Sequence, residues 1–312
     1  MSLAQSNNKS LHLPELNSAY ADIVLRSSDN TEYRMAKSML SQASPFFEQM
    51  FTLPQPETAG EPQDDLPVIP LSEPGEVLDV LLRFCVPQPP PKLDDLTVAL
   101  RILNASKKYD MEWARAVAND AFARCAEKEP LRAYCLACKH DLADGVRSAA
   151  RHCLRLSLEH IIDSPPSDVE DISGAELLRL LQYRRSCRDA VATRVLSWAW
   201  LSEYYASLGV VPRNKVWAFD CCTQAGSRND DQGITITSRQ WWLDYMLQTV
   251  DKLRVSTWEG TVRGEDALAA FIQSGSCARC CAAATSDLVH FTQHMAKEVA
   301  AVISETTQKF WP

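Results

Sequence analysis

Closely spaced cysteines toward the C-terminal end are the residues of this chain best suited to chemistry. Cys277 and Cys280 form a Cys-x-x-Cys pair, and Cys221 and Cys222 are a second source of thiolates earlier in the chain. Zinc takes four nitrogen or sulfur ligands in a tetrahedron, and one Cys-x-x-Cys pair supplies two of them. Cys221, Cys222, Cys277 and Cys280 are therefore the candidate ligands of a structural zinc site.

The zinc hypothesis stands beside a simpler one. If the Cys221–Cys222 pair supplies one thiolate, a fourth ligand is still missing, and His290 and His294 are the candidates for it. The alternative is that these cysteines are small apolar residues of a helical core. Cys135 and Cys138 favour that alternative more strongly, since a spacing of three puts both thiols on one helix face, as core packing also requires.

Motifs typical of enzymes do not occur in the sequence. It contains no Gly-rich phosphate loop, no His-Glu-x-x-His and no Gly-x-Ser-x-Gly, which are the patterns that bind phosphates, hold a catalytic zinc or present a nucleophilic serine. The sequence alone leaves open a catalytic cysteine–histidine pair whose members meet only in the folded structure. We therefore expect a protein without enzymatic activity and without a cofactor, zinc excepted.

The charge balance argues against nucleic acid as a partner. The formal net charge is −8, so the overall field repels phosphate backbones and direct binding would need a strong local basic patch. The best candidate is a run of arginines that we interpret as the solvated face of a helix, Arg179, Arg184, Arg185, Arg188 and Arg194.

The chain also lacks the apolar segments that membranes and secretion require. No stretch approaches the roughly 18 uncharged apolar residues of a membrane span, and the first residues do not resemble a signal peptide. We expect a cytoplasmic or nuclear protein. In those compartments the eleven cysteines would be thiols or metal ligands, because glutathione keeps disulfides reduced.

The front of the chain predicts a small sheet with helices. Residues 22–26 and 32–35 read as two strands around a Ser-Ser-Asp-Asn turn, and a short helix is expected over 37–42. Ser44-Pro45 is typical of a helix start, with serine as the cap and proline at the first helical position. The following Phe46, Phe47, Met50 and Phe51 have the spacing of a stripe that faces the sheet.

The rest of the chain is expected to be mainly helical. A Pro-rich acidic loop at 52–66 precedes a short edge strand at 67–71 and a helix at 76–85. Further helices are predicted over 96–109, 113–127, 130–140, 142–158, 173–205 with a break near Ser186, 238–254, 264–274 and 285–309, with irregular structure at 209–237. Ser173 and Glu176 have the spacing of a capping box.

This order of elements is similar to the BTB/POZ family. Asp22 before the first strand, Lys37, Ser38 and Leu40 after the second, and Ser44 with Phe47 opening a helix occupy the places of that family's pattern. Residues 130–161 and 172–187 resemble the helical extension that follows the domain in fungal BTB proteins. Two features depart from the family: Ala36 stands where histidine is usual, and the loop at 52–66 is a Pro-rich insertion.

The resemblance implies an α+β fold, mainly α. It divides the chain into a flexible N-terminus at 1–18, a BTB/POZ domain at 19–126, a helical extension at 127–208 and an all-helical C-terminal region at 209–312 that carries the cysteine cluster.

The resemblance also implies a non-enzymatic protein-interaction module that forms a homodimer, so that each contact patch meets its own copy. The expected contact residues are Lys37, Ser38, Leu40 and Ser41. A second implied partner is a cullin, which would make the chain a substrate adaptor of a ubiquitin ligase. The family's hydrophobic-x-Glu motif for that contact has no well-spaced match in the loop at 52–66. A transcriptional or scaffolding role without cullin binding is the alternative.

Overall fold

The computed structural model describes residues 20–53, 66–197, 200–201, 225–229, 235–274 and 278–311. The chain forms two compact units, residues 1–128 and residues 129–312. The predicted division near residues 208 and 209 falls outside the described residues and stays a prediction. None of the helices in the described ranges is long and apolar enough to cross a membrane.

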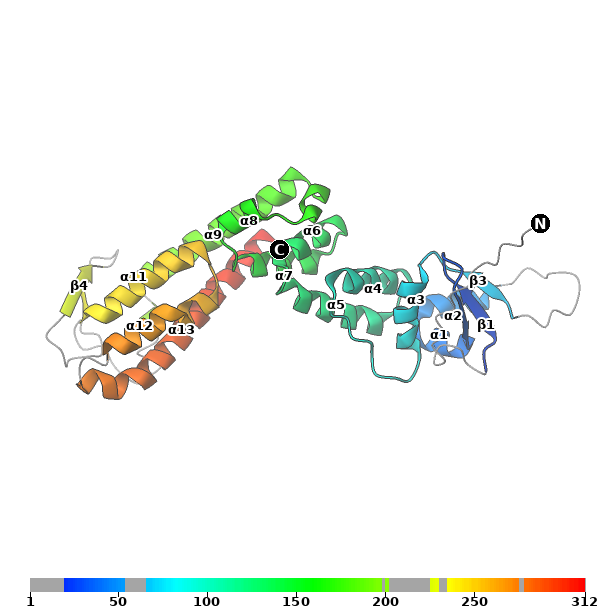
Figure 1. The fold of residues 1–312 in the computed structure, drawn as a ribbon, viewed down its shortest axis with the longest axis horizontal. Coiled ribbons are helices and arrows are strands. Elements are labelled where there is room, and N and C mark those ends of the chain that lie inside the picture. Colours follow the sequence, from blue (N-terminus) through cyan, green and yellow to red (C-terminus); the bar gives the residue numbers. More distant parts are fainter. Residues whose placement is uncertain are drawn as a thin grey trace, which may run out of the picture. The chain divides into compact units, whose positions relative to one another are not determined.

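The first unit is a small sheet packed with helices (Figure 1). Its elements, in chain order, are β1 (Ile23–Arg26), β2 (Glu32–Met35), α1 (Lys37–Ala43), α2 (Pro45–Thr52), β3 (Val68–Pro70), α3 (Gly75–Leu82), the 3-10 helix η2 (Arg83–Cys85), α4 (Leu96–Lys108) and α5 (Glu112–Ala126). The strand order is β2-β1-β3. β1 pairs antiparallel with β2, opposing Ile23 to Met35, and parallel with β3, opposing Val24 to Val68.

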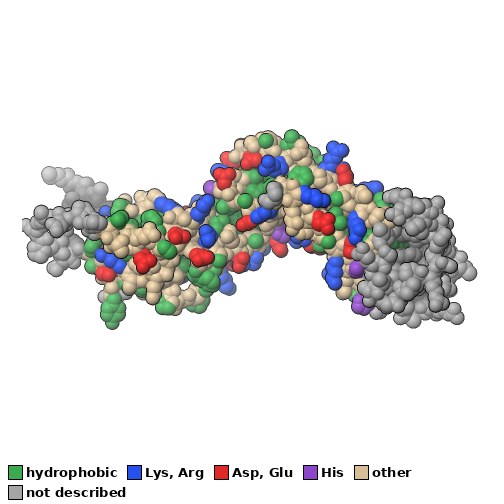
Figure 2. All heavy atoms as spheres, turned by 180° about the vertical axis from the view of Figure 1, so that it is seen from behind, with side chains coloured by type: hydrophobic (Ala, Val, Ile, Leu, Met, Phe, Trp, Pro, Cys, Tyr) green, Lys and Arg blue, Asp and Glu red, His purple; other side chains and the backbone are tan. Residues whose placement is uncertain are grey.

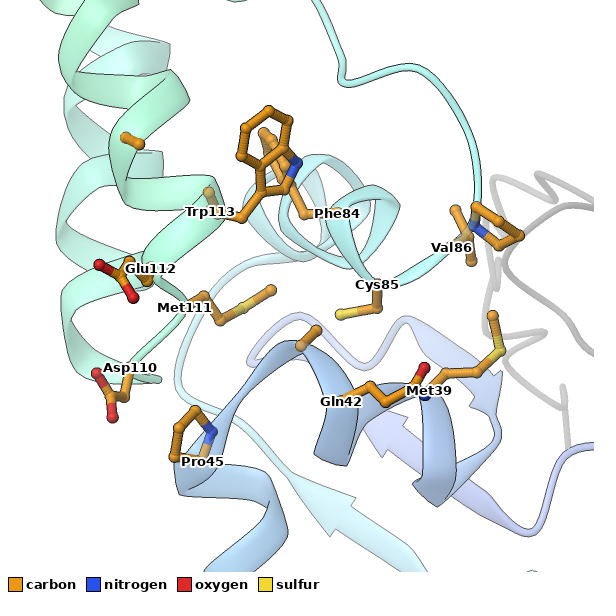
Figure 3. Close-up of a pocket in the computed structure, with 14 residues that line it drawn as sticks. Met39, Gln42, Pro45, Phe84, Cys85, Val86, Asp110, Met111, Glu112 and Trp113 are labelled. Carbon is orange, nitrogen blue, oxygen red and sulfur yellow. The ribbon is translucent and has the colours of Figure 1, made fainter.

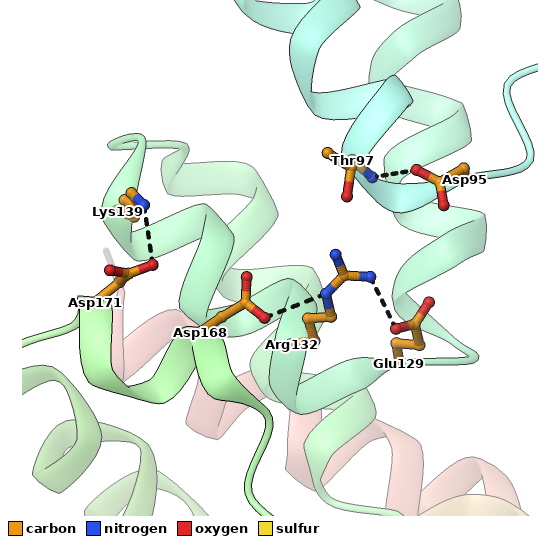
Figure 4. Close-up of polar contacts among 7 residues, drawn as sticks. All are labelled: Asp95, Thr97, Glu129, Arg132, Lys139, Asp168 and Asp171. Carbon is orange, nitrogen blue, oxygen red and sulfur yellow. Dashed lines mark hydrogen bonds and ion pairs between the residues drawn. The ribbon is translucent and has the colours of Figure 1, made fainter.

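Local signals in the sequence explain where these elements begin. The turn between β1 and β2 contains Asn30 with φ of 65°, a left-handed conformation that asparagine tolerates better than most residues. The Ser44 hydroxyl accepts a hydrogen bond from the Phe47 N–H at 3.1 Å, which caps α2 as predicted. Asp95 caps α4 in the same way, accepting from the Thr97 N–H at 2.8 Å (Figure 4).

Gly75 opens α3 at a point of close approach. Its carbonyl accepts a hydrogen bond from the Tyr33 hydroxyl at 2.8 Å, and its N–H donates to both Asp29 carboxylate oxygens at 3.1 Å. A Cβ atom at this position would lie 2.9 Å from the Thr31 hydroxyl oxygen. Glycine is therefore what allows α3 to sit against the turn between β1 and β2.

The second unit is helical, with one two-stranded hairpin. Its elements, in chain order, are α6 (Pro130–Lys139), α7 (Ala143–Cys153), α8 (Leu158–Asp163), the 3-10 helix η3 (Ser167–Asp171), α9 (Gly174–Ser197), β4 (Ala225–Asn229), β5 (Thr235–Arg239), α11 (Gln240–Val255), the 3-10 helix η4 (Glu259–Arg263), α12 (Glu265–Ser274) and α13 (Ala278–Phe310). The predicted small sheet packed with helices at the front and the helical character of the C-terminal part are confirmed. The hairpin β4–β5 replaces part of the irregular stretch expected at 209–237.

Long helices α9, α11, α12 and α13 pack together as a bundle (Figure 1). Buried residues recur every three or four positions on α9 and so form one continuous apolar stripe along the helix. They are Leu180, Tyr183, Cys187, Val191 and Val195. A matching stripe on α13 consists of Leu288, Phe291, Met295, Val299 and Ile303. Arg194 of α9 pairs with Glu298 of α13 at 2.9 Å.

Two predicted helix boundaries in this unit were wrong. The helix expected over 142–158 ends at Cys153, because the Ser157 hydroxyl accepts from the His160 N–H at 3.1 Å and starts α8. No break occurs near Ser186, since Tyr183 and Cys187 on either side are fully buried and hold α9 to its neighbours. The capping box is confirmed: the Ser173 hydroxyl accepts from the Glu176 N–H at 3.2 Å, and the Glu176 carboxylate accepts from the Ser173 N–H at 2.7 Å.

Ion pairs fasten η3 to α6 (Figure 4). The Arg132 side chain lies between two carboxylates, Glu129 at 3.1 Å and Asp168 at 3.3 Å. Lys139, at the other end of α6, pairs with Asp171 at 2.9 Å. These pairs are partly exposed, so each contributes at most about 1 kcal/mol, and their main effect is to fix the path of the chain between α8 and α9.

Candidate functional site

A groove lies beside α1 in the first unit. Its volume is about 900 Å³, which is large enough for several side chains of a partner. It is lined by the end of α1, the start of α2, η2 with the residues after it, and the start of α5. The break between α1 and α2 at Ser44, and the turn before α5 where Asp110 has φ of 47°, bring these four segments to one place.

Apolar side chains dominate the wall of this groove (Figure 3). Met111 and Cys85 point toward one another across it, Trp113 stands beside Phe84, and Met39 comes from α1. Burial raises the pKa of the Cys85 thiol to about 12, so this cysteine is an uncharged part of the wall. The carboxylates of Asp110 and Glu112 point away from the groove.

Trp113 is the most exposed of the large apolar residues on this groove. Its side chain is 60% exposed, although it lies among apolar neighbours. Tryptophan is enriched at the centre of protein interfaces because it buries a large apolar area. No sequence pattern singled out Trp113; the one signal is its place on the first turn of α5, next to the charged residues Asp110 and Glu112.

The predicted dimer residues on α1 have different surroundings. Leu40 is 0% exposed and belongs to the core of its own unit, where it supports α1 from below. Ser38 is exposed, and Lys37 and Ser41 are half-buried. The Lys37 N–H donates to the Asp22 carboxylate at 2.7 Å, which anchors the start of α1 to the sheet. These four residues stay a prediction as an interface.

The aromatic run on α2 separates into core and surface. Phe47 is 0% exposed and stacks on the Tyr109 ring at 5.3 Å between centroids. Phe46 is 40% exposed and meets the edge of the same ring at 5.5 Å. Met50 and Phe51 are half-buried. The predicted stripe is therefore fully buried at Phe47, and its other members extend to the surface.

Tyr109 joins the aromatic core to a half-buried carboxylate, that of Glu73. Its hydroxyl donates a hydrogen bond to Glu73, and Lys108 donates to the same carboxylate at 2.7 Å. Burial acts to raise the pKa of Glu73, but the hydrogen bonds from Lys108 and Tyr109 outweigh it and hold the pKa below its ordinary value of 4.5. The charged form of Glu73 is thus the form that stabilises the folded state.

The variant Glu73→Gln tests this network. A lowered pKa in the folded state stabilises the protein above the unfolded value near 4.5, and this stability is lost as the pH falls through the folded pKa. At pH 7 we expect the variant to be less stable by about 1 kcal/mol. Toward pH 3 the difference should shrink, and denaturant unfolding at both pH values measures it. A constant difference would contradict the assignment.

The cysteine hypotheses have separate outcomes. Cys221, Cys222 and Cys277 lie outside the described residues, and for Cys280 the structure describes the backbone, within α13. The zinc site therefore stays a prediction. Among the described residues, no group of three or more His, Cys, Asp or Glu could hold a metal ion. Burial raises the pKa of Cys135 and Cys153 to about 12, which fits protonated thiols in a helical core.

Comparison with known proteins agrees with the geometry of the first unit. The search of curated proteins finds no similar sequence. Residues 11–122 match the family model of the BTB/POZ domain, a range that contains the sheet, α1 to α4, most of α5 and the residues of the groove. This chain therefore contains a BTB/POZ domain at residues 11–122, a fold that acts as a protein-protein interaction module.

Proposed function

We propose that the chain forms a homodimer through α1 and binds a further protein in the groove beside it. The observation that carries this proposal is the apolar groove of the BTB/POZ domain with Trp113 60% exposed at its side. A tryptophan exposed to this extent in an apolar pocket favours a protein partner, because covering it removes a large apolar area from water.

The proposed dimer contact is the exposed side of α1. Ser38 and Ser41 are small, so two copies of the helix can approach closely across a two-fold axis. Leu40 is buried directly beneath them and keeps the helix rigid in its unit. Met39 belongs to the wall of the groove, so the same helix contributes to both proposed contacts.

Changing Ser38 to glutamate tests the dimer. Near a two-fold axis the new charge faces its own copy, and the repulsion in a partly desolvated contact should weaken association about tenfold or more. Light scattering at micromolar concentration measures the shift from twice 34.9 kDa toward 34.9 kDa. The matched control is Ser28→Glu in the exposed turn after β1. A monomeric wild type would contradict the proposal, and a fully dimeric S38E would move the interface away from α1.

The finer proposal for the groove is a cullin, which would make the chain a substrate adaptor of a ubiquitin ligase. The support is the BTB/POZ match together with the presence of a second, helical unit, to which we assign the binding of the substrate. Calorimetry with the N-terminal half of the organism's own cullin should give micromolar binding, and Trp113→Ala should weaken it about tenfold or more. Phe46→Ala, which changes an exposed aromatic outside the groove lining, is the control.

Absence of cullin binding by the wild type would contradict the adaptor role. The dimer and the groove would then belong to a scaffolding or transcriptional protein that uses the same contacts without ubiquitin chemistry. Binding that is unchanged in the Trp113→Ala variant would keep the adaptor role but exclude the groove as its site.

A further inference from the structure

A second pocket, lined by four arginines, lies within the second unit. Its volume is about 380 Å³. α9 contributes Arg184, Arg185 and Arg188, and the end of α11 contributes Arg254. The sequence pattern predicted a solvated face for the arginines of α9, and for Arg184 that prediction was wrong, because this half-buried side chain donates to the Cys153 and Leu156 carbonyls.

The arrangement follows from helical spacing. Three of the arginines follow Leu181 at three, four and seven positions along α9, so all four side chains share one face of the helix. They are Arg184, Arg185 and Arg188. Leu154 and Leu158 of the segment before α9 and Val255 after Arg254 add apolar walls. The pocket therefore combines a cationic rim with an apolar lining.

The charges in this pocket are unbalanced. Arg184 donates its hydrogen bonds to the backbone carbonyls of Cys153 and Leu156, so its positive charge is not paired with a carboxylate in the described part of the chain. Arg185 and Arg188 share one carboxylate, Asp189, at 3.7 and 3.0 Å.

The fourth arginine and the nearby acidic residues leave the pocket with more positive than negative groups. Arg254 pairs with Asp251 at 2.9 Å, and Glu159 is the one acidic residue among those that line the pocket. Four guanidinium groups thus meet three nearby carboxylates, and Asp251 and Asp189 are themselves 72% and 55% exposed. A ligand carboxylate can therefore replace an exposed ion pair here at little cost.

We propose that this arginine pocket binds an acidic segment of a partner protein. Guanidinium groups hold carboxylates with two parallel hydrogen bonds, and Arg185, Arg188 and Arg254 are exposed enough to do so. An apolar side chain next to the carboxylates would fit against Leu154 and Leu181. The proposal does not depend on the BTB/POZ domain, because the pocket lies wholly in the second unit.

An acidic peptide fits this pocket better than a nucleic acid. The net charge of −8 repels a long polyanion, and the arginines surround one small cavity with apolar walls. On the face shown in Figure 2, positive and negative side chains are interspersed, whereas a nucleic-acid surface needs a continuous basic stripe.

Fluorescence anisotropy with the full chain tests the proposal. The probe is a fluorescein-labelled peptide in which pairs of glutamates flank leucines, and the reference is the same peptide with glutamine in place of glutamate. We expect the acidic peptide to bind at least about tenfold more tightly, and the double variant R188E/R254E to weaken it by about tenfold or more. Arg179→Glu, an exposed arginine on the same helix outside the pocket, should change binding less than about twofold.

Three results would overturn the proposal. They are equal binding of the two peptides, unchanged binding by R188E/R254E, and displacement of the peptide by a single-stranded oligonucleotide at lower concentration than by unlabelled peptide. Circular dichroism checks that the double variant folds. If it does not, R188Q/R254Q removes the two charges without reversing them and is judged by the same criteria.

Discussion

Replacing Phe47 by alanine is expected to lower the free energy of unfolding of the first unit by about 3 to 5 kcal/mol. The Phe47 side chain is 0% exposed and lies between the Tyr109 ring at 5.3 Å and the Phe51 ring at 6.1 Å. Truncation removes the buried ring and leaves a cavity that the surrounding helices fill only in part. Because small domains are stable by about 5 to 15 kcal/mol, this is a large share of the total.

The neighbouring residue supplies the control. Phe46 has the same side chain on the same helix and meets the same Tyr109 ring, but it is 40% exposed. Phe46→Ala should cost about 1 kcal/mol or less, close to the value of one aromatic edge contact. Urea unfolding of the full chain measures both variants, and hydrogen exchange assigns the affected transition to residues 20–126. Equal losses for the two variants would contradict the division of α2 into core and surface.

Replacing Arg184 by methionine is expected to destabilise the second unit by about 2 to 4 kcal/mol. The Arg184 guanidinium donates hydrogen bonds to the Cys153 carbonyl at the end of α7 and to the Leu156 carbonyl, at 2.6 Å in the latter case. Methionine keeps most of the apolar stem but leaves both carbonyl oxygens without these donors, where α7 ends beneath α9.

Arg185→Met is the matched control, one position along the same helix. Arg185 is 78% exposed and pairs with Asp189 at 3.7 Å, so its loss should change stability by about 0.5 kcal/mol or less. Thermal unfolding followed by circular dichroism compares the two variants. If Arg185→Met were the more destabilising change, Arg184 would not be the group that holds α7 to α9.

The two predictions bear on the two proposed sites. Phe47→Ala would destabilise the helix pair α1 and α2, which contributes to the groove and to the proposed dimer contact. A loss in Arg184→Met would show that this arginine is structural. For that reason the binding test of the arginine pocket uses Arg188 and Arg254, whose side chains are 43% and 53% exposed.

The sequence by itself determined the features that depend on neighbours in the chain. The positions of β1 and β2, the Ser44-Pro45 start of α2 and the capping box of Ser173 and Glu176 were all predicted and are present. Each rests on hydrogen bonds or spacing within a few residues, so local sequence is sufficient to specify it. The family resemblance of the front half has the same origin, since its pattern marks these local turns and caps.

Tertiary structure decided what depends on residues far apart in the chain. Phe47 is buried with its ring stacked on Tyr109, about sixty positions later in the chain, whereas Phe46 meets the same ring edge-on and stays 40% exposed. Leu40 belongs to the core although the sequence pattern also suited an interface. The groove around Trp113 and the pocket around Arg184 each join three or more elements. Burial and charge balance at such places follow from packing, which no short stretch of sequence contains.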